Sequence, residues 1–85
     1  MTITEQFNQA VADSKTLTEK PDNETLLQLY SLYKQATEGD AVGDGPENMF
    51  DFVAKAKHNA WAALKGKTKD EAMENYTQLV TKLKG

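Results

Sequence analysis

An apolar stripe at helical spacing in residues 26–36 constrains the fold most. Leu29, Leu32 and Ala36 fall in one narrow sector when this segment is placed on a helix at about 100° per residue. Such a sector is typical of a helix that packs one face against a core. The pattern therefore predicts a helix over residues 22–38.

Three other segments carry the same helical signal. Thr2 with Glu5, and Thr68 with Glu71, have the spacing of capping boxes, in which a hydroxyl and a carboxylate satisfy free amide groups at a helix start. No segment alternates apolar and polar residues as a half-buried strand does. The fold class is therefore predicted to be all-α, a four-helix bundle. Its predicted helices span residues 3–15, 22–38, 49–64 and 69–84.

The composition narrows the class of protein. The chain has 85 residues, no cysteine and a net charge of −3, so we expect one domain over residues 1–85, without disulfides or a thiolate metal site. All ten basic side chains are lysines, so no arginine is available for bidentate phosphate or base contacts. The absence of arginine and the net negative charge argue against a nucleic-acid partner. No apolar run is long enough to span a bilayer and no signal peptide is readable. We therefore expect a cytoplasmic protein with no stable membrane insertion.

Two phenols and a cation widen the apolar sector of the helix predicted over residues 22–38. Tyr30, Tyr33 and Lys34 lie beside the stripe and extend its arc beyond the width that a packed surface helix needs. They form a shoulder suited to a ligand that is aromatic, anionic and apolar at once. The alternative interpretation is ordinary packing, with half-buried phenols and a lysine that extends into solvent. The polar remainder of this helix is a thin strip made by Gln28, Ser31 and Gln35.

Lys57 is the sharpest anomaly in the sequence, because it stands in the middle of an apolar helical face. An unpaired ammonium group is costly to bury, so Lys57 either extends past its neighbours or meets an anion. Tyr76 holds a comparable place at the centre of the last apolar face, where a phenol needs a hydrogen-bond partner. The neighbours of Lys57 one turn away are Val53, Ala54, Ala60 and Trp61.

Other chemistries lack essential parts. His58 is the one histidine, and it has no cysteine, second histidine or nearby acidic residue for metal binding or a catalytic triad. It is also wrongly spaced before residues 64–66 for a phosphotransfer motif. Asp40 and Asp44 lack the further ligands of an EF-hand calcium loop. An acyl carrier protein needs a serine at a helix start, whereas Ser14 falls near a predicted helix end. We therefore expect no metal site, no cofactor and no catalytic residue.

The run Tyr-Ser-Leu-Tyr-Lys-Gln-Ala-Thr-Glu-Gly-Asp at residues 30–40 closely resembles the signature of acyl-CoA-binding proteins. Later motifs follow in that family's order and spacing: Lys-Ala-Lys-His-Asn-Ala-Trp at 55–61, Leu-Lys-Gly at 64–66 and Ala-Met-Glu-Asn-Tyr at 72–76. The resemblance covers essentially the whole chain. It implies a four-helix bundle of up-down-down-up topology with the ligand in a bowl-like groove.

The resemblance also implies which residues bind the CoA head group. Tyr30, Lys34 and Lys57 are expected to hold the 3′-phosphate of CoA. Tyr33 is expected to contribute its ring to the adenine site and to the path of the acyl tail. These assignments give the aromatic and cationic shoulder a ligand.

Further positions match the rest of the family's groove. Tyr76 and Lys15 are expected to complete it around the nucleotide and the thioester end. Leu27, together with Leu26 and Leu29, matches positions whose side chains line the acyl channel.

The sequence departs from the family pattern at a few positions. His58 stands where the family usually has tryptophan, and Val53 stands where a lysine is often found. The loop that contains Pro46-Glu47-Asn48 is one residue longer than is common. These departures are expected to alter the packing near the acyl tail and to remove one candidate contact to a phosphate.

We expect reversible, non-catalytic binding and intracellular carriage of medium- to long-chain acyl-CoA thioesters by a monomer. Buried methylenes of the tail supply most of the affinity, at about 0.8 kcal/mol each. Hydrogen bonds to the phosphates, at roughly 1.5–3 kcal/mol each, select CoA over a free fatty acid. The alternative from another class is a helical interaction module whose shoulder docks a partner helix.

Overall fold

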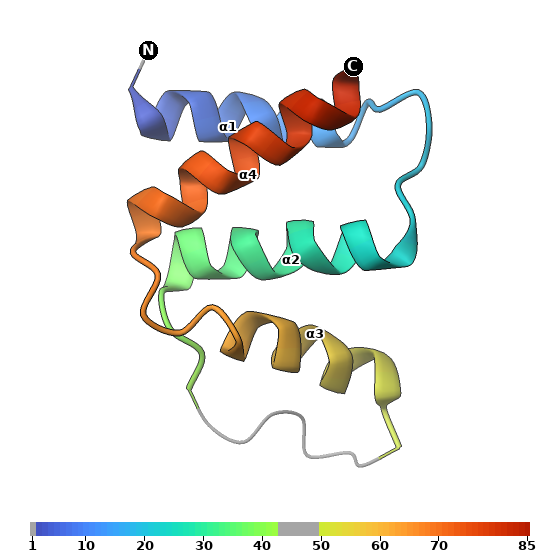
Figure 1. The fold of residues 1–85 in the computed structure, drawn as a ribbon, viewed down its shortest axis with the longest axis vertical. Coiled ribbons are helices and arrows are strands. Elements are labelled where there is room, and N and C mark those ends of the chain that lie inside the picture. Colours follow the sequence, from blue (N-terminus) through green and yellow to red (C-terminus); the bar gives the residue numbers. More distant parts are fainter. Residues whose placement is uncertain (1, 43–49) are drawn as a thin grey trace.

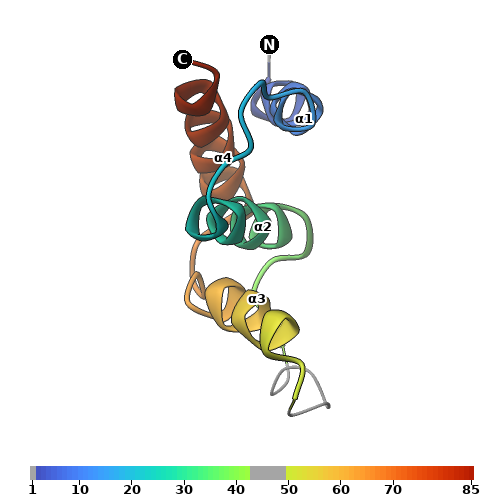
Figure 2. The ribbon, with the colours of Figure 1, turned by 90° about the vertical axis from the view of Figure 1, so that its right-hand side faces the viewer.

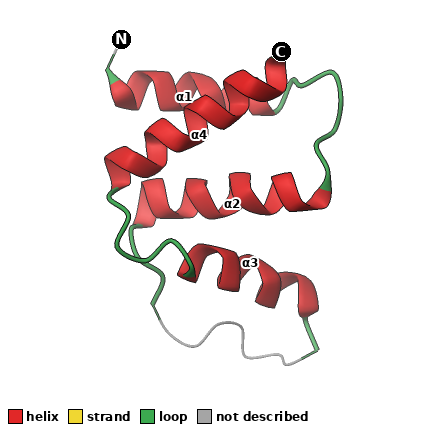
Figure 3. Ribbon diagram, in the orientation of Figure 1, coloured by secondary structure: helices red, strands yellow, loops and turns green. Residues whose placement is uncertain are grey.

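The structure is a computed structural model that describes residues 2–42 and 50–85. Within these ranges the chain forms helices joined by loops and contains no strand (Figure 3). The all-α class predicted from the sequence is confirmed. The helices are α1 (Ile3–Ser14), α2 (Asn23–Glu38), α3 (Phe52–Ala62) and α4 (Lys69–Lys84).

The helices have the up-down-down-up topology. The colours in Figure 1 show that α1 and α4 run in one direction and that α2 and α3 run in the opposite one. α4 packs on both α1 and α2, whereas α3 packs on α2 alone among the helices (Figure 2). Because α3 stands at one end of this stack with a single helical neighbour, no residue from 52 to 62 is buried.

Side-chain caps set the beginnings of α1 and α4. The Thr2 hydroxyl oxygen accepts from the Glu5 N–H at 3.1 Å, and the Glu5 carboxylate accepts from the Thr2 N–H at 3.3 Å, as the predicted capping box requires. Thr68 likewise accepts from the Glu71 N–H at 3.1 Å, while its hydroxyl donates to the Glu71 carboxylate. These contacts satisfy amide groups that a helix start leaves without partners.

The beginning of α3 differs from the predicted range of 49–64. The helix starts directly after Asp51, whose carboxylate accepts from the Ala54 N–H at 3.0 Å. The shift arises because Asp51, which the predicted range places inside the helix, is itself the cap. Asn48 and Met49 lie outside the described residues.

The core lies between α1, α2 and α4, and the predicted apolar stripes supply it. Leu29 and Ala36 from the stripe of α2 are 8% and 1% exposed, and Leu32 packs against them. Tyr76 is 4% exposed, as its central place on the face of α4 predicts. The buried apolar residues are Phe7, Ala10, Leu29, Ala36, Ala72, Tyr76 and Val80.

α2 also buries two polar side chains, which the division into an apolar arc and a polar strip failed to predict. Ser31 is 4% exposed and Gln35 is fully buried, because α2 lies between α3 and α4 and is covered on two sides. Ser31 donates to the Gln28 carbonyl at 3.0 Å. The Gln35 amide donates to Asp40 at 2.8 Å and to the Lys67 carbonyl at 2.7 Å, so it links α2 to the segment before α4.

Candidate functional site

A hollow of about 330 Å³, here called the tyrosine hollow, lies among α1, α2 and α4. Tyr30 and Tyr33 from α2 and Tyr76 from α4 line it. Lys15 lines it too, and it follows the last residue of α1 instead of lying in the last helical turn as predicted. The other lining residues are Val11, Ser14, Pro21, Leu26 and Leu29.

The rings at the tyrosine hollow are held by packing on one another. Phe7 of α1 has its ring centroid 5.1 Å from that of Tyr76, edge to face, and 5.9 Å from that of Tyr33, stacked. The Tyr33 and Tyr76 centroids are 6.4 Å apart. Tyr33 remains 41% exposed, so its ring joins the buried cluster to the surface of the hollow. Such spacings are favourable for aromatic pairs, and they fix the ring orientations.

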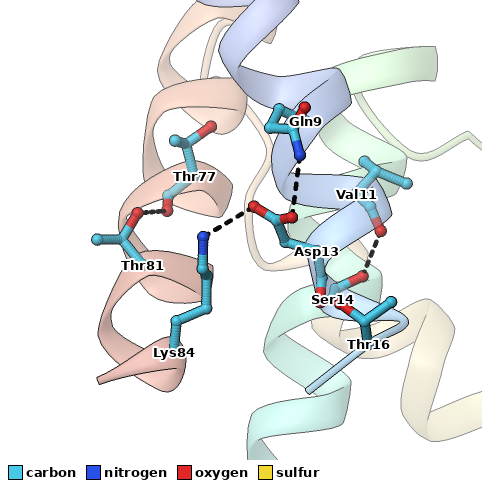
Figure 4. A network of polar contacts seen from close by, with 8 residues as sticks. All are labelled: Gln9, Val11, Asp13, Ser14, Thr16, Thr77, Thr81 and Lys84. Carbon is cyan, nitrogen blue, oxygen red and sulfur yellow. Dashed lines mark hydrogen bonds and ion pairs between the residues drawn. The ribbon is translucent and has the colours of Figure 1, made fainter. Parts of the chain in front are cut away.

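Hydrogen bonds hold the Tyr76 phenol in place. Its hydroxyl donates to the Ser14 hydroxyl oxygen at 3.1 Å. Ser14 in turn donates to the Val11 carbonyl at 2.7 Å, as Figure 4 shows. The partner that the sequence required for this phenol is therefore a serine at the end of α1. Sequence analysis did not name Ser14 as a site residue, because nothing in the pattern reveals a contact across 62 positions.

A second polar network fixes the end of α1 against the end of α4. Asp13 accepts from Lys84 of α4 at 3.0 Å and from Gln9 at 3.0 Å (Figure 4). The hydrogen bond from Lys84, followed by that from Gln9, lowers the pKa of Asp13. This attachment positions the two residues that come next in the chain, Ser14 and Lys15.

A second hollow, of about 450 Å³, lies between α2 and α3 and is here called the apolar hollow. Leu27 lines it from α2, and Lys57 lines it from α3. Leu26 lines both hollows, so the two hollows adjoin at this residue. The remaining lining residues are Asn23, Phe52, Val53 and Ala56.

Lys57 and Tyr30 meet where the two hollows adjoin. The Lys57 ammonium lies over the Tyr30 ring, 5.2 Å from its centroid, which is within the range of a cation–π contact. Lys57 is exposed, because the apolar face predicted around it is covered only in part. Val53, one turn away, is 66% exposed. The ammonium group is thus accessible to solvent and rests on a ring instead of being buried.

Lys34 lines neither hollow. Its ammonium forms an ion pair with Glu38 one turn further along α2, and it also lies over the Trp61 ring, 5.0 Å from the centroid. The hydrogen bond that the Lys34 ammonium donates to Glu38 is the largest cause of a raised pKa for Lys34, so the group is firmly protonated. Of the predicted site residues, the structure gathers Lys15, Leu27, Tyr30, Tyr33, Lys57 and Tyr76 around the two hollows and leaves Lys34 outside them.

Contacts at the far end of α2 anchor α3. Gly39 ends α2 with φ of 83°, a conformation that favours glycine, and its carbonyl accepts from the Trp61 indole N–H at 2.8 Å. Asp40 accepts from the Gly66 N–H at 3.0 Å and from Gln35 at 2.8 Å. These two hydrogen bonds, with that from Gly66 the larger, lower the pKa of Asp40. The polar Gln-Ala-Thr-Glu-Gly-Asp part of the motif is therefore mainly structural.

Several lining residues escaped the sequence analysis. Phe52 and Ala56 lie on the side of α3 next to Lys57, and they follow the same helical spacing. That spacing could have placed them beside Lys57, but only the position of α2 reveals that they face a hollow. Pro21 was assigned to a connector, yet it lines the tyrosine hollow.

Metal chemistry and membrane spanning have no support in the part of the chain that the structure describes. No group of metal-ligating side chains gathers in residues 2–42 or 50–85. In those same ranges, no helix combines the length and the apolar character that crossing a bilayer demands.

Comparisons with known proteins establish the family of this chain. Residues 4–80 match the family model described as acyl CoA binding protein. The chain is 47% identical to the acyl-CoA-binding protein homolog 1 of Caenorhabditis elegans, over 95% of this chain and 93% of that protein. The crystal structure of Oryza sativa acyl-CoA-binding protein 2 superposes with a TM-score of 0.89 at 39% identity, and the match covers 96% of this chain and 90% of that one.

A similar segment occurs in a longer protein. The chain is 48% identical to part of the rat (Rattus norvegicus) enoyl-CoA delta isomerase 2, over 98% of this chain but only 21% of that protein. The matches to the family model, to relatives of similar length and to a solved structure agree in extent and in fold. On these grounds, this chain belongs to the acyl-CoA-binding protein family.

Proposed function

We propose that residues 1–85 act as one acyl-CoA-binding domain that binds long-chain acyl-CoA reversibly, with the CoA head group at the tyrosine hollow and the acyl chain in the apolar hollow. The observation that carries this proposal is that the two hollows adjoin. One is aromatic and carries a lysine, the other is largely aliphatic, and they share Leu26 and adjoin at the contact between Lys57 and Tyr30. A thioester with a nucleotide at one end and a hydrocarbon at the other has the same division.

The tyrosine hollow has groups suited to the head group. The exposed face of Tyr33 offers a surface on which an adenine ring can stack. Lys15 lines the tyrosine hollow and Lys57 lies over the Tyr30 ring. Both lysines are exposed, and each ammonium can donate to phosphate oxygens. Lys34 can join them only after its ammonium leaves Glu38.

The apolar hollow suits the acyl chain. Leu26, Leu27, Val53 and Ala56 offer aliphatic surface, and its volume falls in the range of about 300–1,000 Å³ that small-molecule sites occupy. Each methylene that leaves water here contributes about 0.8 kcal/mol, so the tail supplies most of the affinity.

The arrangement supports binding without catalysis. Among the described residues that line the two hollows, Ser14 alone carries an aliphatic hydroxyl, which donates to the Val11 carbonyl and accepts from Tyr76. It therefore lacks the adjacent base that an acyl-transfer nucleophile needs. His58, the one histidine of the chain, packs edge-on against Trp61 instead. We propose that the protein carries the thioester in the cytoplasm as a monomer. Sedimentation in the presence and absence of ligand tests the oligomeric state.

Titration calorimetry with palmitoyl-CoA, CoA and palmitate tests the proposal. We expect one tight site for palmitoyl-CoA, weaker binding of CoA and little binding of palmitate. Equal binding of the free acid and the thioester contradicts a CoA-selective site. A stoichiometric protein partner together with no response to acyl-CoA favours the helix-docking module instead.

A further inference from the structure

The side-chain amide of Gln35 is fully buried, and only its nitrogen is hydrogen-bonded. Nε2 donates to Asp40 Oδ1 at 2.8 Å and to the Lys67 carbonyl at 2.7 Å, which uses both of its hydrogens. The carbonyl oxygen Oε1 is buried as well, and no donor among residues 2–42 and 50–85 lies within hydrogen-bonding distance of it. Unpaired buried acceptors are costly and rare in native proteins, so Oε1 requires a partner.

The neighbours of Nε2 fix the orientation of this amide. The Asp40 carboxylate and the Lys67 carbonyl are both acceptors, so neither can donate to Oε1. Turning the amide over would place Oε1 against these two acceptors and would break both hydrogen bonds. The same Oδ1 of Asp40 also accepts from the Gly66 N–H at 3.0 Å, which holds the carboxylate in place. Oε1 therefore points away from Asp40 and Lys67.

Two further polar side chains belong to the same region. Ser31 lies one turn before Gln35 on α2, so the two side chains share a face of the helix, and Ser31 is only 4% exposed. Its hydroxyl donates to the Gln28 carbonyl at 3.0 Å, which leaves its oxygen able to accept. Asn75 of α4 accepts from the Lys67 ammonium at 2.7 Å, so Lys67 contacts both amides, Gln35 through its carbonyl and Asn75 through its side chain.

This set of groups suits a water molecule better than a metal cation. Water can donate to Oε1 and to the Ser31 oxygen, and it can accept from the Nδ2 group of Asn75. A cation could use the two oxygens, but it would be repelled by the Nδ2 hydrogens. The nearby carboxylate of Asp40 already accepts two hydrogen bonds. A polar gap that is too wide for a direct hydrogen bond is commonly bridged by water.

We propose that one buried water molecule binds Gln35 Oε1 and that Ser31 and Asn75 complete its hydrogen bonds. The site lies where the segment after α2, at Asp40, meets the segment before α4, at Lys67. These two segments flank α3 in the chain, so the water completes the joint that holds both ends of that part of the structure. The inference goes beyond the proposed function and does not depend on it.

A crystal structure of the wild type, at a resolution that shows ordered waters, tests the site directly. We expect a water at about 2.5–3.0 Å from Gln35 Oε1, with a second polar protein atom within hydrogen-bonding distance of it. A protein donor bonded directly to Oε1, or no density beside it, overturns the proposal. Crystals soaked in thallium(I) identify a monovalent cation by its anomalous scattering, and a thallium peak at this position also overturns it.

NMR cross-relaxation between water and protein tests the same site in solution. A long-lived water gives nuclear and rotating-frame Overhauser effects of opposite sign, whereas surface water gives effects of the same sign. We expect opposite signs at the side-chain amides of Gln35 and Asn75 in the wild type. The same sign at Gln35 contradicts a bound water, and this measurement needs no variant.

The variant Gln35→Met keeps the length of the side chain but removes the acceptor. We expect the long-lived water signal at the Asn75 amide to be lost in this variant. Gln78→Met is the matched control, because Gln78 is an exposed glutamine on α4, and it should keep the signal. Circular dichroism verifies that each variant is folded. A signal that persists at Asn75 in folded Gln35→Met would show that other groups hold the water, and it would overturn the assignment to Gln35.

Discussion

The Lys57 ammonium lies 5.2 Å from the centroid of the Tyr30 ring and joins α3 to α2 at the boundary of the two hollows. The contact keeps the cation at a place where one side is aliphatic and the other is aromatic. A cation–π contact at an exposed site is worth only about 0.5–1 kcal/mol, so a phosphate can displace the ring at little cost. The pair therefore holds Lys57 ready for an anion without burying it.

Replacement of Lys57 by alanine should weaken the binding of palmitoyl-CoA by more than about 1 kcal/mol, because one hydrogen bond to a charged phosphate is lost. The unfolding free energy should change little, since Lys57 is exposed. Calorimetry and urea unfolding measure the two quantities. Lys55→Ala is the matched control, because Lys55 is an exposed lysine on α3 that lines neither hollow. Unchanged affinity in Lys57→Ala would place the anion elsewhere.

Replacement of Glu38 by glutamine should tighten the binding of acyl-CoA. Glu38 holds the Lys34 ammonium in an ion pair away from both hollows, so a phosphate must compete with this carboxylate for Lys34. Exposed ion pairs are worth roughly 0.2–1 kcal/mol, which corresponds to a gain of up to about fivefold. Calorimetry at low and high salt measures it, and the gain should shrink as salt screens the pair.

The control for this variant is Glu74→Gln, which makes the same charge change on an exposed residue of α4 that lines neither hollow. If both variants tighten binding equally, the effect comes from the overall charge and not from release of Lys34. If Glu38→Gln weakens binding, the ion pair positions Lys34 for the ligand instead of competing with it.

A double-mutant cycle on Ser14 and Tyr76 should reveal coupling of about 0.5–1.5 kcal/mol in the unfolding free energy. Tyr76→Phe removes the donor and Ser14→Ala removes the acceptor of their 3.1 Å hydrogen bond. The double variant should therefore be less destabilised than the sum of the single variants. Urea unfolding of the four proteins measures this, and additivity would show that the hydrogen bond contributes nothing.

Local patterns predicted the helices well because the signals that end a helix are local. Thr2 and Thr68 cap α1 and α4 as their capping-box spacing predicted. Asp22 caps α2, which begins one residue after its predicted start, and Gly39 ends it. The predicted start of α3 at residue 49 was wrong, because Asp51 lies inside the predicted range and is the cap.

Side-chain burial was predicted less well for α2, which packs against two helices, and for α3, which packs against one. A single apolar stripe assumes one packed side, but α2 has α3 and α4 on two sides, so Gln35 is buried. The opposite holds for α3, whose stripe touches α2 alone, so Val53 stays exposed.

The candidate site was predictable as a set of residues but not as a geometry. The family resemblance assigned Tyr30, Lys34 and Lys57 to one phosphate, and the structure brings Lys57 and Tyr30 into contact but leaves Lys34 outside both hollows. The partners of Lys34 and Tyr76 depend on which side chains the fold places nearby. Glu38 was available one turn away, but nothing in the sequence decides between it and a ligand.

Acid should weaken the attachment of α3 through Asp40. Its carboxylate accepts from the Gly66 N–H and the Gln35 amide, and these bonds lower its pKa in the folded state below the value of about 3.9 in an unfolded chain. The stabilisation is therefore fully present above about pH 4 and is lost as the pH falls through the lowered pKa of the folded state. Asp40→Asn keeps an oxygen acceptor but lacks the charge, so it should be less stable than the wild type at neutral pH and should approach it in acid. Urea unfolding between about pH 7 and pH 2 measures the difference in unfolding free energy between the two proteins.

Asp13 and Asp22 also have lowered pKa values, so the wild type and Asp40→Asn both lose some stability in acid. Only the difference between the two proteins therefore reports on Asp40. A difference that stays constant with pH would mean that the shape of the side chain, and not its charge, joins α2 to the segment before α4.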